Sequence, residues 1–144
     1  MTTTVRQILR GRHEVYKVAP EASVLEALRL MAEKNVGAVL VLSEGRLVGI
    51  FSERDYARKL VLQGKSSNHT PVSEVMTPKV VTIDPARTAG ECMALMTEKR
   101  FRHLPVIEKG ELIGVISIGD VVRAVVEEQQ FTIKQLESYI TSGG

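Results

Sequence analysis

Apolar residues recur along this chain at two different spacings. In the segment SVLEALRLMAEK, Val24, Leu28 and Met31 fall on one stripe at helical spacing. Its first residue, Ser23, stands three positions before a glutamate, which is the capping-box signature of a helix start. The next segment, AVLVLSEGRLVGIFS, has two apolar runs joined by a glycine-bearing turn and predicts a β-hairpin. With the apolar run VYKV ahead of them and a second helix opening at Ser52, these signals predict a strand-helix-strand-strand-helix unit.

The same order of elements occurs twice. Residues 18–58 align without gaps to residues 83–123, at an offset of 65 (83 − 18 = 65), and the 41 aligned columns hold 13 identities. Most other columns pair apolar with apolar residues, so VVTI, TAGECMALMTEK and LPVIEKGELIGVIS are the second strand, helix and hairpin. An in-register duplication predicts an α/β (α+β) fold of two strand-helix-strand-strand-helix repeats related by a pseudo-twofold axis.

The repeats divide the sequence into four parts. We predict a first repeat with its lead-in helix VRQIL in residues 1–64, a linker rich in turn-forming residues in 65–71, and a second repeat in 72–130. Residues 131–144 complete a long amphipathic helix and a short tail. A unit of roughly 55 residues can scarcely cover its apolar faces alone, so we expect the two repeats to pack together. The last helix either covers the core of its own chain or contributes to a twofold dimer.

Composition and charge narrow the possible functions. The 19 Lys and Arg nearly balance the 17 Asp and Glu, and only three Tyr and three Phe could stack on bases, so nucleic acid is not favoured as a partner. A small basic patch at Arg10, Arg12 and His13 is most often a solvated face, and the alternative is contact with a phosphate or a partner. The polar N-terminus lacks a secretory signal, and the apolar runs are shorter than the ~20 residues of a membrane span. We therefore expect a cytoplasmic protein with no membrane partner.

Few residues are suited to catalysis or metal binding. The single cysteine, Cys92, aligns with an alanine inside an amphipathic helix and is expected to be a small core residue rather than a nucleophile. His13, His69 and His103 show no metal-ligand spacing with one another or with that cysteine, so we expect no metal site.

A serine and an aspartate recur where each hairpin runs into a helix. GIFSERD ends in Ser52 and Asp55, and GVISIGD repeats the pair at Ser117 and Asp120. One interpretation is an ordinary helix cap. The other is an anion site, in which the helix N-terminus and the serine hydroxyl meet a phosphate while the carboxylate holds the hydroxyls of a ribose. The residues alone leave both interpretations open.

These two motifs, together with VMTPKVVTIDP and RHLPV, resemble the cystathionine β-synthase (CBS) domain, of which two copies form a Bateman module. The resemblance covers nearly the whole chain. It implies binding of an adenine nucleotide in clefts between the repeats, with AMP or NAD favoured over ATP, ADP or S-adenosylmethionine. It also implies that binding regulates a partner protein.

The resemblance also implies which residues contact the nucleotide. Asp55 and Asp120 match the family's ribose-binding aspartate, and Ser52 and Ser117 match its phosphate-facing hydroxyl.

Other positions match the family pattern on the strands. Lys17 and Thr82 occupy a strand position that lines the nucleotide, Arg102 and His103 match basic residues that face phosphate, and Arg54 is a further contact in the first repeat. The first repeat has no charge at the positions of Arg102 and His103, so we expect the two clefts to bind unequally.

The favoured function is therefore a non-catalytic nucleotide sensor that forms a homodimer and signals to an unidentified protein effector. The alternative is a nucleotide-processing enzyme that uses Asp120 and His103 as acid and base. Against it stands the lack of a recognisable nucleophile or metal cluster.

Overall fold

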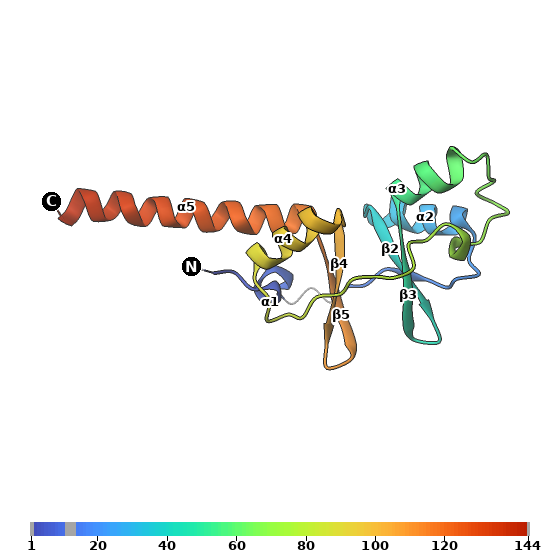
Figure 1. Ribbon diagram of the computed structural model, residues 1–144, viewed down its shortest axis with the longest axis horizontal. Coiled ribbons are helices and arrows are strands. Elements are labelled where there is room, and N and C mark those ends of the chain that lie inside the picture. The colour runs from blue at the N-terminus through green and yellow to red at the C-terminus, as the bar shows by residue number, and fades with distance from the viewer. Residues whose placement is uncertain (1, 11–13, 144) are drawn as a thin grey trace. The chain divides into compact units, whose positions relative to one another are not determined.

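The chain folds into two compact units, each built around one repeat (Figure 1). The computed structural model describes residues 2–10 and 14–143, so Arg12 and His13 of the basic patch lie outside the described residues. One unit comprises Glu14–Val80, and the other comprises Met1–His13 together with Val81–Gly144. The boundaries of the two units therefore differ from those of the two sequence repeats, because the N-terminal segment belongs to the unit that holds the second repeat.

The unit Glu14–Val80 contains the predicted strand, helix and hairpin of the first repeat. Strand β1 (Lys17–Val18) pairs parallel with β2 (Ala38–Ser43), which pairs antiparallel with β3 (Arg46–Ser52). Helix α2 (Val24–Lys34) begins at the predicted cap, since the Ser23 side chain accepts a hydrogen bond from the Glu26 amide at 3.1 Å. The second helix is short: α3 (Glu53–Asp55) continues as a π-helical turn, η1 (Tyr56–Val61), and η2 (Val72–Glu74) follows the linker. The fully buried core includes Val24, Ala27, Val39, Val41, Phe51, Val72 and Val75.

The other unit repeats this arrangement around the second hairpin. Helix α4 (Ala89–Lys99) starts with a complete capping box between Thr88 and Glu91, and β4 (His103–Glu108) pairs antiparallel with β5 (Glu111–Ser117). Helix α1 (Val5–Leu9) is the predicted lead-in, and α5 (Ile118–Gly143) is the long C-terminal helix. The core of this unit includes Val5, Cys92, Met96, Leu104, Val106, Ile116 and Val121.

The predicted strand VVTI of the second repeat is wrong, because only a single bridge between Ile83 and Val106 joins it to β4. In the first repeat, the Leu40 amide donates to the Tyr16 carbonyl at 2.9 Å and extends the ladder. The residue aligned with Leu40 is Pro105 (40 + 65 = 105), which has no N–H to donate. One substitution between the copies thus reduces a strand to a bridge.

The lead-in of each repeat packs on the other repeat. In the unit that holds the second repeat, the Val5 amide donates to the Arg87 carbonyl at 2.8 Å. In the unit that holds the first repeat, the Val72 amide donates to the Ala22 carbonyl, also at 2.8 Å. Since Ala22 and Arg87 are aligned positions, the two lead-ins occupy equivalent places at an offset of 67 (72 − 5 = 67). This exchange explains why the compact units differ from the repeats in sequence.

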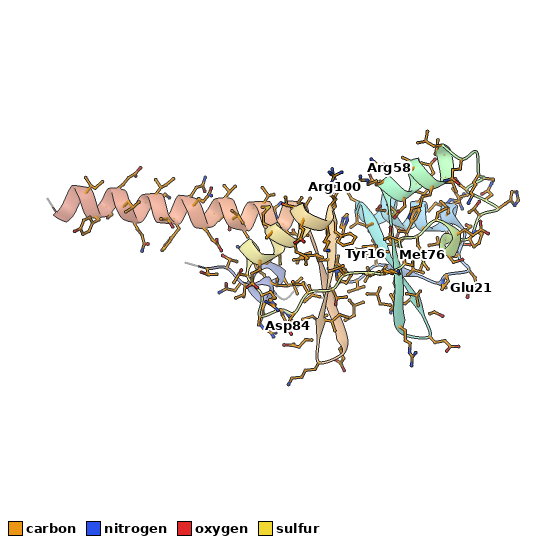
Figure 2. The ribbon with its side chains drawn as sticks, viewed as in Figure 1. Tyr16, Glu21, Arg58, Met76, Asp84 and Arg100 are labelled. Atoms are coloured by element: carbon orange, nitrogen blue, oxygen red, sulfur yellow. The ribbon has the colours of Figure 1, made fainter. Side chains whose placement is uncertain are left out.

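Gly49 is required by the close approach of the segment that follows η2. Ile50 and Thr77 exchange two backbone hydrogen bonds of 3.0 and 2.8 Å, which hold this segment against β3. A Cβ on Gly49 would lie 2.4 Å from the Met76 sulfur and 3.1 Å from the Thr77 carbonyl oxygen. Figure 2 shows Met76 beside β3. The glycine of GIFSERD is thus explained by the neighbouring segment of the chain.

Helix α5 packs on its unit only through its first turns. Val121 and Ala124 are buried, and Val121 belongs to the core that α1 and α4 complete. From residue 129 to 140 every side chain is exposed, so this half of the helix does not cover the core of its own chain. In the described part of the chain, no helix combines the length and the apolar character needed to cross a membrane.

We expect Gly49→Ala to destabilise the protein by about 1–3 kcal/mol, because the added methyl group overlaps Met76 and crowds the Thr77 carbonyl. The matched control is Gly90→Ala in the first turn of α4, where the nearest atom to a new Cβ is 3.9 Å away. That variant should be neutral or stabilised by up to about 1 kcal/mol. Urea unfolding of both variants measures the difference, and equal stabilities would contradict the packing role of Gly49.

Candidate functional site

In the second repeat, four of the predicted site residues lie where the hairpin runs into α5. His103, at the start of β4, is paired in register with Ser117, at the end of β5. The Ile118 amide donates to the Arg102 carbonyl at 2.8 Å, which holds the helix N-terminus against the start of β4. Asp120 follows in the first turn of α5. The structure therefore brings Arg102, His103, Ser117 and Asp120 together.

The serine and aspartate form a helix cap in both repeats. The Asp120 amide donates to the Ser117 hydroxyl at 3.2 Å, and the Ser117 amide donates to Asp120 Oδ2 at 2.9 Å. Ser52 and Asp55 make the same two bonds, at 3.2 and 3.0 Å. Both serine–aspartate pairs therefore form helix caps. The cap uses one oxygen of each aspartate carboxylate, and the two repeats differ in what surrounds the other oxygen.

In the first repeat, the second oxygen of Asp55 is enclosed by the protein. The Thr77 hydroxyl donates to Asp55 Oδ1 at 3.0 Å, and Lys59 Nζ lies 3.1 Å from the same oxygen. Lys59 is fixed in turn by the Met76 carbonyl at 3.3 Å. Asp55 is buried, with 7% of its surface exposed. Its carboxylate is therefore fully engaged in internal contacts.

In the second repeat, the residues that enclose Asp55 are replaced. Lys59 aligns with Ala124 (59 + 65 = 124), and the offset of the lead-ins places Arg10 at the position of Thr77 (77 − 67 = 10). Here Asp120 and Ala124 line a cavity of about 620 Å³ between α5 and the lead-in helix α1, which we call the α1–α5 groove. Loss of the lysine thus coincides with an open space beside the aspartate.

The α1–α5 groove carries charges of both signs. Arg123 Nη1 lies 3.7 Å from Asp120 Oδ1, and Arg10 Nη2 lies 3.6 Å from Glu127 Oε2. All four residues line the groove. The side chains of Arg10 and Arg123 are 76% and 70% exposed, so both guanidinium groups are accessible to an anion. The groove thus presents a carboxylate acceptor next to two cationic donors.

The remaining predicted residues lie on exposed positions of the two units. Lys17 is on β1 opposite Leu40 in the strand register, and Arg54 is in α3. Thr82 precedes the bridge that replaces the second-repeat strand. All three side chains are exposed, as is Arg102. Their contact with a nucleotide stays a prediction.

Sequence reasoning missed the residues that make the two aspartates different. Lys59 and Ala124 stand one position beyond the aligned columns, at the same offset of 65, and differ in charge, so this signal was present in the sequence. Thr77 and Arg10 could not be found in this way, because they come from lead-ins that exchange repeats in the folded chain.

The lone cysteine is a core residue, as predicted. Cys92 is fully buried in α4, and burial raises the pKa of its thiol to about 11. It is therefore protonated at neutral pH and inaccessible to a substrate. Among residues 2–10 and 14–143, no group of three His, Cys, Asp or Glu is placed to hold a metal ion.

Comparison with known protein families identifies both repeats. The family model of the CBS domain matches residues 5–62 and again residues 72–127. The chain belongs to the CBS domain family. Two matches in tandem make it a CBS-pair protein, in agreement with the predicted fold of two related repeats.

Its relatives are other proteins that contain CBS domains. The chain is 44% identical over 126 residues to the mitochondrial CBS domain-containing protein CBSX3 of Arabidopsis thaliana, covering 84% of this chain but only 61% of that protein. A solved protein with CBS domains from Burkholderia ambifaria MC40-6 is 53% identical, with a TM-score of 0.85 over 91% of this chain and 99% of that one.

A further solved CBS-pair structure contains a ligand. CBSX2 of Arabidopsis thaliana was solved in complex with AMP, and it is 28% identical to this chain. The match has a TM-score of 0.72 and covers 87% of this chain and 97% of CBSX2.

The environments of the two aspartates predict unequal effects of the same substitution. Asp55→Asn should destabilise the protein by about 1–2 kcal/mol more than Asp120→Asn, because an amide nitrogen would face Lys59 or displace the Thr77 hydroxyl. Both variants keep one oxygen for the cap. Thermal unfolding followed by circular dichroism measures the difference. A larger loss in Asp120→Asn would contradict the enclosed state of Asp55.

Proposed function

We propose that this CBS-pair protein is a non-catalytic regulatory module that binds an adenine nucleotide, AMP or NAD in preference to ATP, ADP or S-adenosylmethionine. The presence of AMP in the structure of CBSX2 supports the ligand class. The protein would signal by presenting a different surface to a protein effector when the nucleotide is bound. We further propose that it acts as a homodimer in the cytoplasm.

The observation that carries the proposal is the difference between Asp55 and Asp120. A ribose has two neighbouring hydroxyls and needs a carboxylate that can accept from both. Asp55 accepts from Thr77 and pairs with Lys59, whereas Asp120 lies 3.7 Å from the exposed Arg123 guanidinium and lines the α1–α5 groove. We infer that the nucleotide binds at Asp120 in preference to Asp55, with Ser52, Arg54 and Asp55 contributing little.

The groups around Asp120 suit the phosphate of the same ligand. Arg10 and Arg123 place guanidinium groups in the α1–α5 groove, and an arginine can bind a phosphate through two parallel hydrogen bonds. Ser117 begins the helix, and His103 lies opposite it in the strand register. The proposed set for the second repeat is therefore Arg10, Thr82, Arg102, His103, Ser117, Asp120 and Arg123. Lys17 is the proposed contact at the position of Thr82 in the first repeat.

The proposal is tested by calorimetric titration of refolded, ligand-free protein with AMP, ATP, NAD, NADH and S-adenosylmethionine. We expect AMP or NAD to bind, and Asp120→Asn to weaken binding by about tenfold or more, since a hydrogen bond to a charged group is lost. Asp55→Asn is the matched control and should change the affinity by less than about threefold.

Two results would overturn the proposal. Equal losses of affinity in Asp55→Asn and Asp120→Asn would show that the sites are equivalent. Conversion of the bound nucleotide to a product during the titration, detected by chromatography, would make the protein an enzyme rather than a sensor.

A further inference from the structure

Beyond its first turns, α5 carries apolar side chains that its own unit leaves uncovered. Val126, Ile133, Leu136 and Ile140 are 43%, 53%, 57% and 73% exposed. Figure 2 shows that the later part of this helix extends beyond α1 and α4. An apolar stripe of this length on a single helix is costly to leave in water.

The exposed residues follow the heptad spacing of a helix pair. Along α5, the positions of Val122, Val126, Gln129, Ile133, Leu136 and Ile140 are separated alternately by four and three residues. That spacing keeps a straight seam against a partner helix, with Val126, Ile133 and Ile140 at one core position of the heptad and Val122, Gln129 and Leu136 at the other. We call these six residues the α5 seam. Val121 and Ala124, which face the unit's own core, are not part of it.

We propose that the α5 seam pairs antiparallel with the α5 seam of a second copy of this chain. None of the six seam residues lines the α1–α5 groove, so substitutions in the seam test the pairing without removing a groove residue. Arg123, beside the seam, also lines the groove and is left unchanged in these tests.

The seam is complementary to itself in the antiparallel direction. Its positions are symmetric about residue 131, so Val122 would pack on Ile140 of the second copy, Val126 on Leu136, and Gln129 on Ile133. A twofold axis at this point makes every layer occur twice, as an isologous dimer requires. Only the central layers contain a polar residue, and the long glutamine stem can bury its methylenes while its amide reaches water.

The charges beside the seam favour the same direction. In an antiparallel pair, Arg123 lies beside Glu137 of the second copy, so opposite charges meet. In a parallel pair, Arg123 would lie beside Ile118 and Glu137 beside Thr132, so neither charge meets its opposite.

Packing of the first turns of α5 on its own unit keeps the seam helical before a second copy binds. The seam covers residues 122–140, a length of about 28 Å at 1.5 Å per residue. A free helix of this length is marginal in water, but α5 is nucleated by the packing of Val121 and Ala124 on its own unit. Dimer formation therefore does not have to provide the free energy of helix nucleation.

Sedimentation velocity of the full chain over a range of concentrations tests the pairing. The wild-type protein should be a dimer at micromolar concentration, and the double variant Ile133→Asp with Leu136→Asp should raise the dissociation constant by about 100-fold or more, because buried carboxylates would face an apolar partner. The matched control is Phe131→Asp, which removes an exposed apolar residue of the same helix outside the seam. It should remain a dimer. A monomeric wild-type protein, or a double variant that remains a dimer, would overturn the proposal.

Single cysteines report the direction of the pair. Thr132 is the flanking position of the heptad beside Ile133. In the antiparallel arrangement this flanking position meets its own copy, so Thr132→Cys should form an intermolecular disulfide under mild oxidation. Gln129→Cys should not, because Gln129 lies opposite Ile133 there and opposite its own copy only in a parallel pair. The native Cys92 is buried and gives a silent background. Cross-linking of Gln129→Cys without cross-linking of Thr132→Cys would overturn the antiparallel pairing.

Discussion

The need to satisfy backbone amides at the start of a helix constrains both repeats of this protein. At each hairpin end the chain turns directly from a strand into a helix, and a serine and an aspartate cap the first turn by exchanging hydrogen bonds. The cap fixes the aspartate carboxylate with one oxygen turned to the backbone. The other oxygen is directed to whatever packs beside it, so the same motif can be structural or functional according to its neighbours.

Those neighbours come from the exchanged lead-ins and from one pair of equivalent positions, Lys59 and Ala124, in the helices that follow the hairpins. In the first repeat, Thr77 and Lys59 close over Asp55, and the motif is a buried cap. In the second repeat, Arg10 and Ala124 take their places, and Asp120 lines a groove. The duplication thus produced two similar hairpin ends. A few substitutions enclose the aspartate of one and place the aspartate of the other at a groove with two arginines.

A few sequence differences between the repeats also change their strands and helices. Replacement of Leu40 by Pro105 removes one amide and reduces a parallel strand to a bridge. The second helix ends after a π-helical turn at Val61 in the first repeat but continues through Gly143 in the second. The extended helix gains a face that its own unit does not need, and the heptad spacing of that face favours another helix as its partner.

The repeated unit, its caps and most of its elements could be predicted from the amino-acid sequence. Helical stripes, hairpins and Ser-x-x-Asp caps depend on residues a few positions apart, so their spacing could be recognised directly, and the duplication strengthened each assignment. It also predicted the buried role of Cys92. Which lead-in packs on which repeat became known from the folded structure alone, and with it that Thr77 contacts Asp55 while Arg10 and Asp120 line the same groove. Such contacts join segments that are far apart in the chain, so the spacing of neighbouring residues does not predict them.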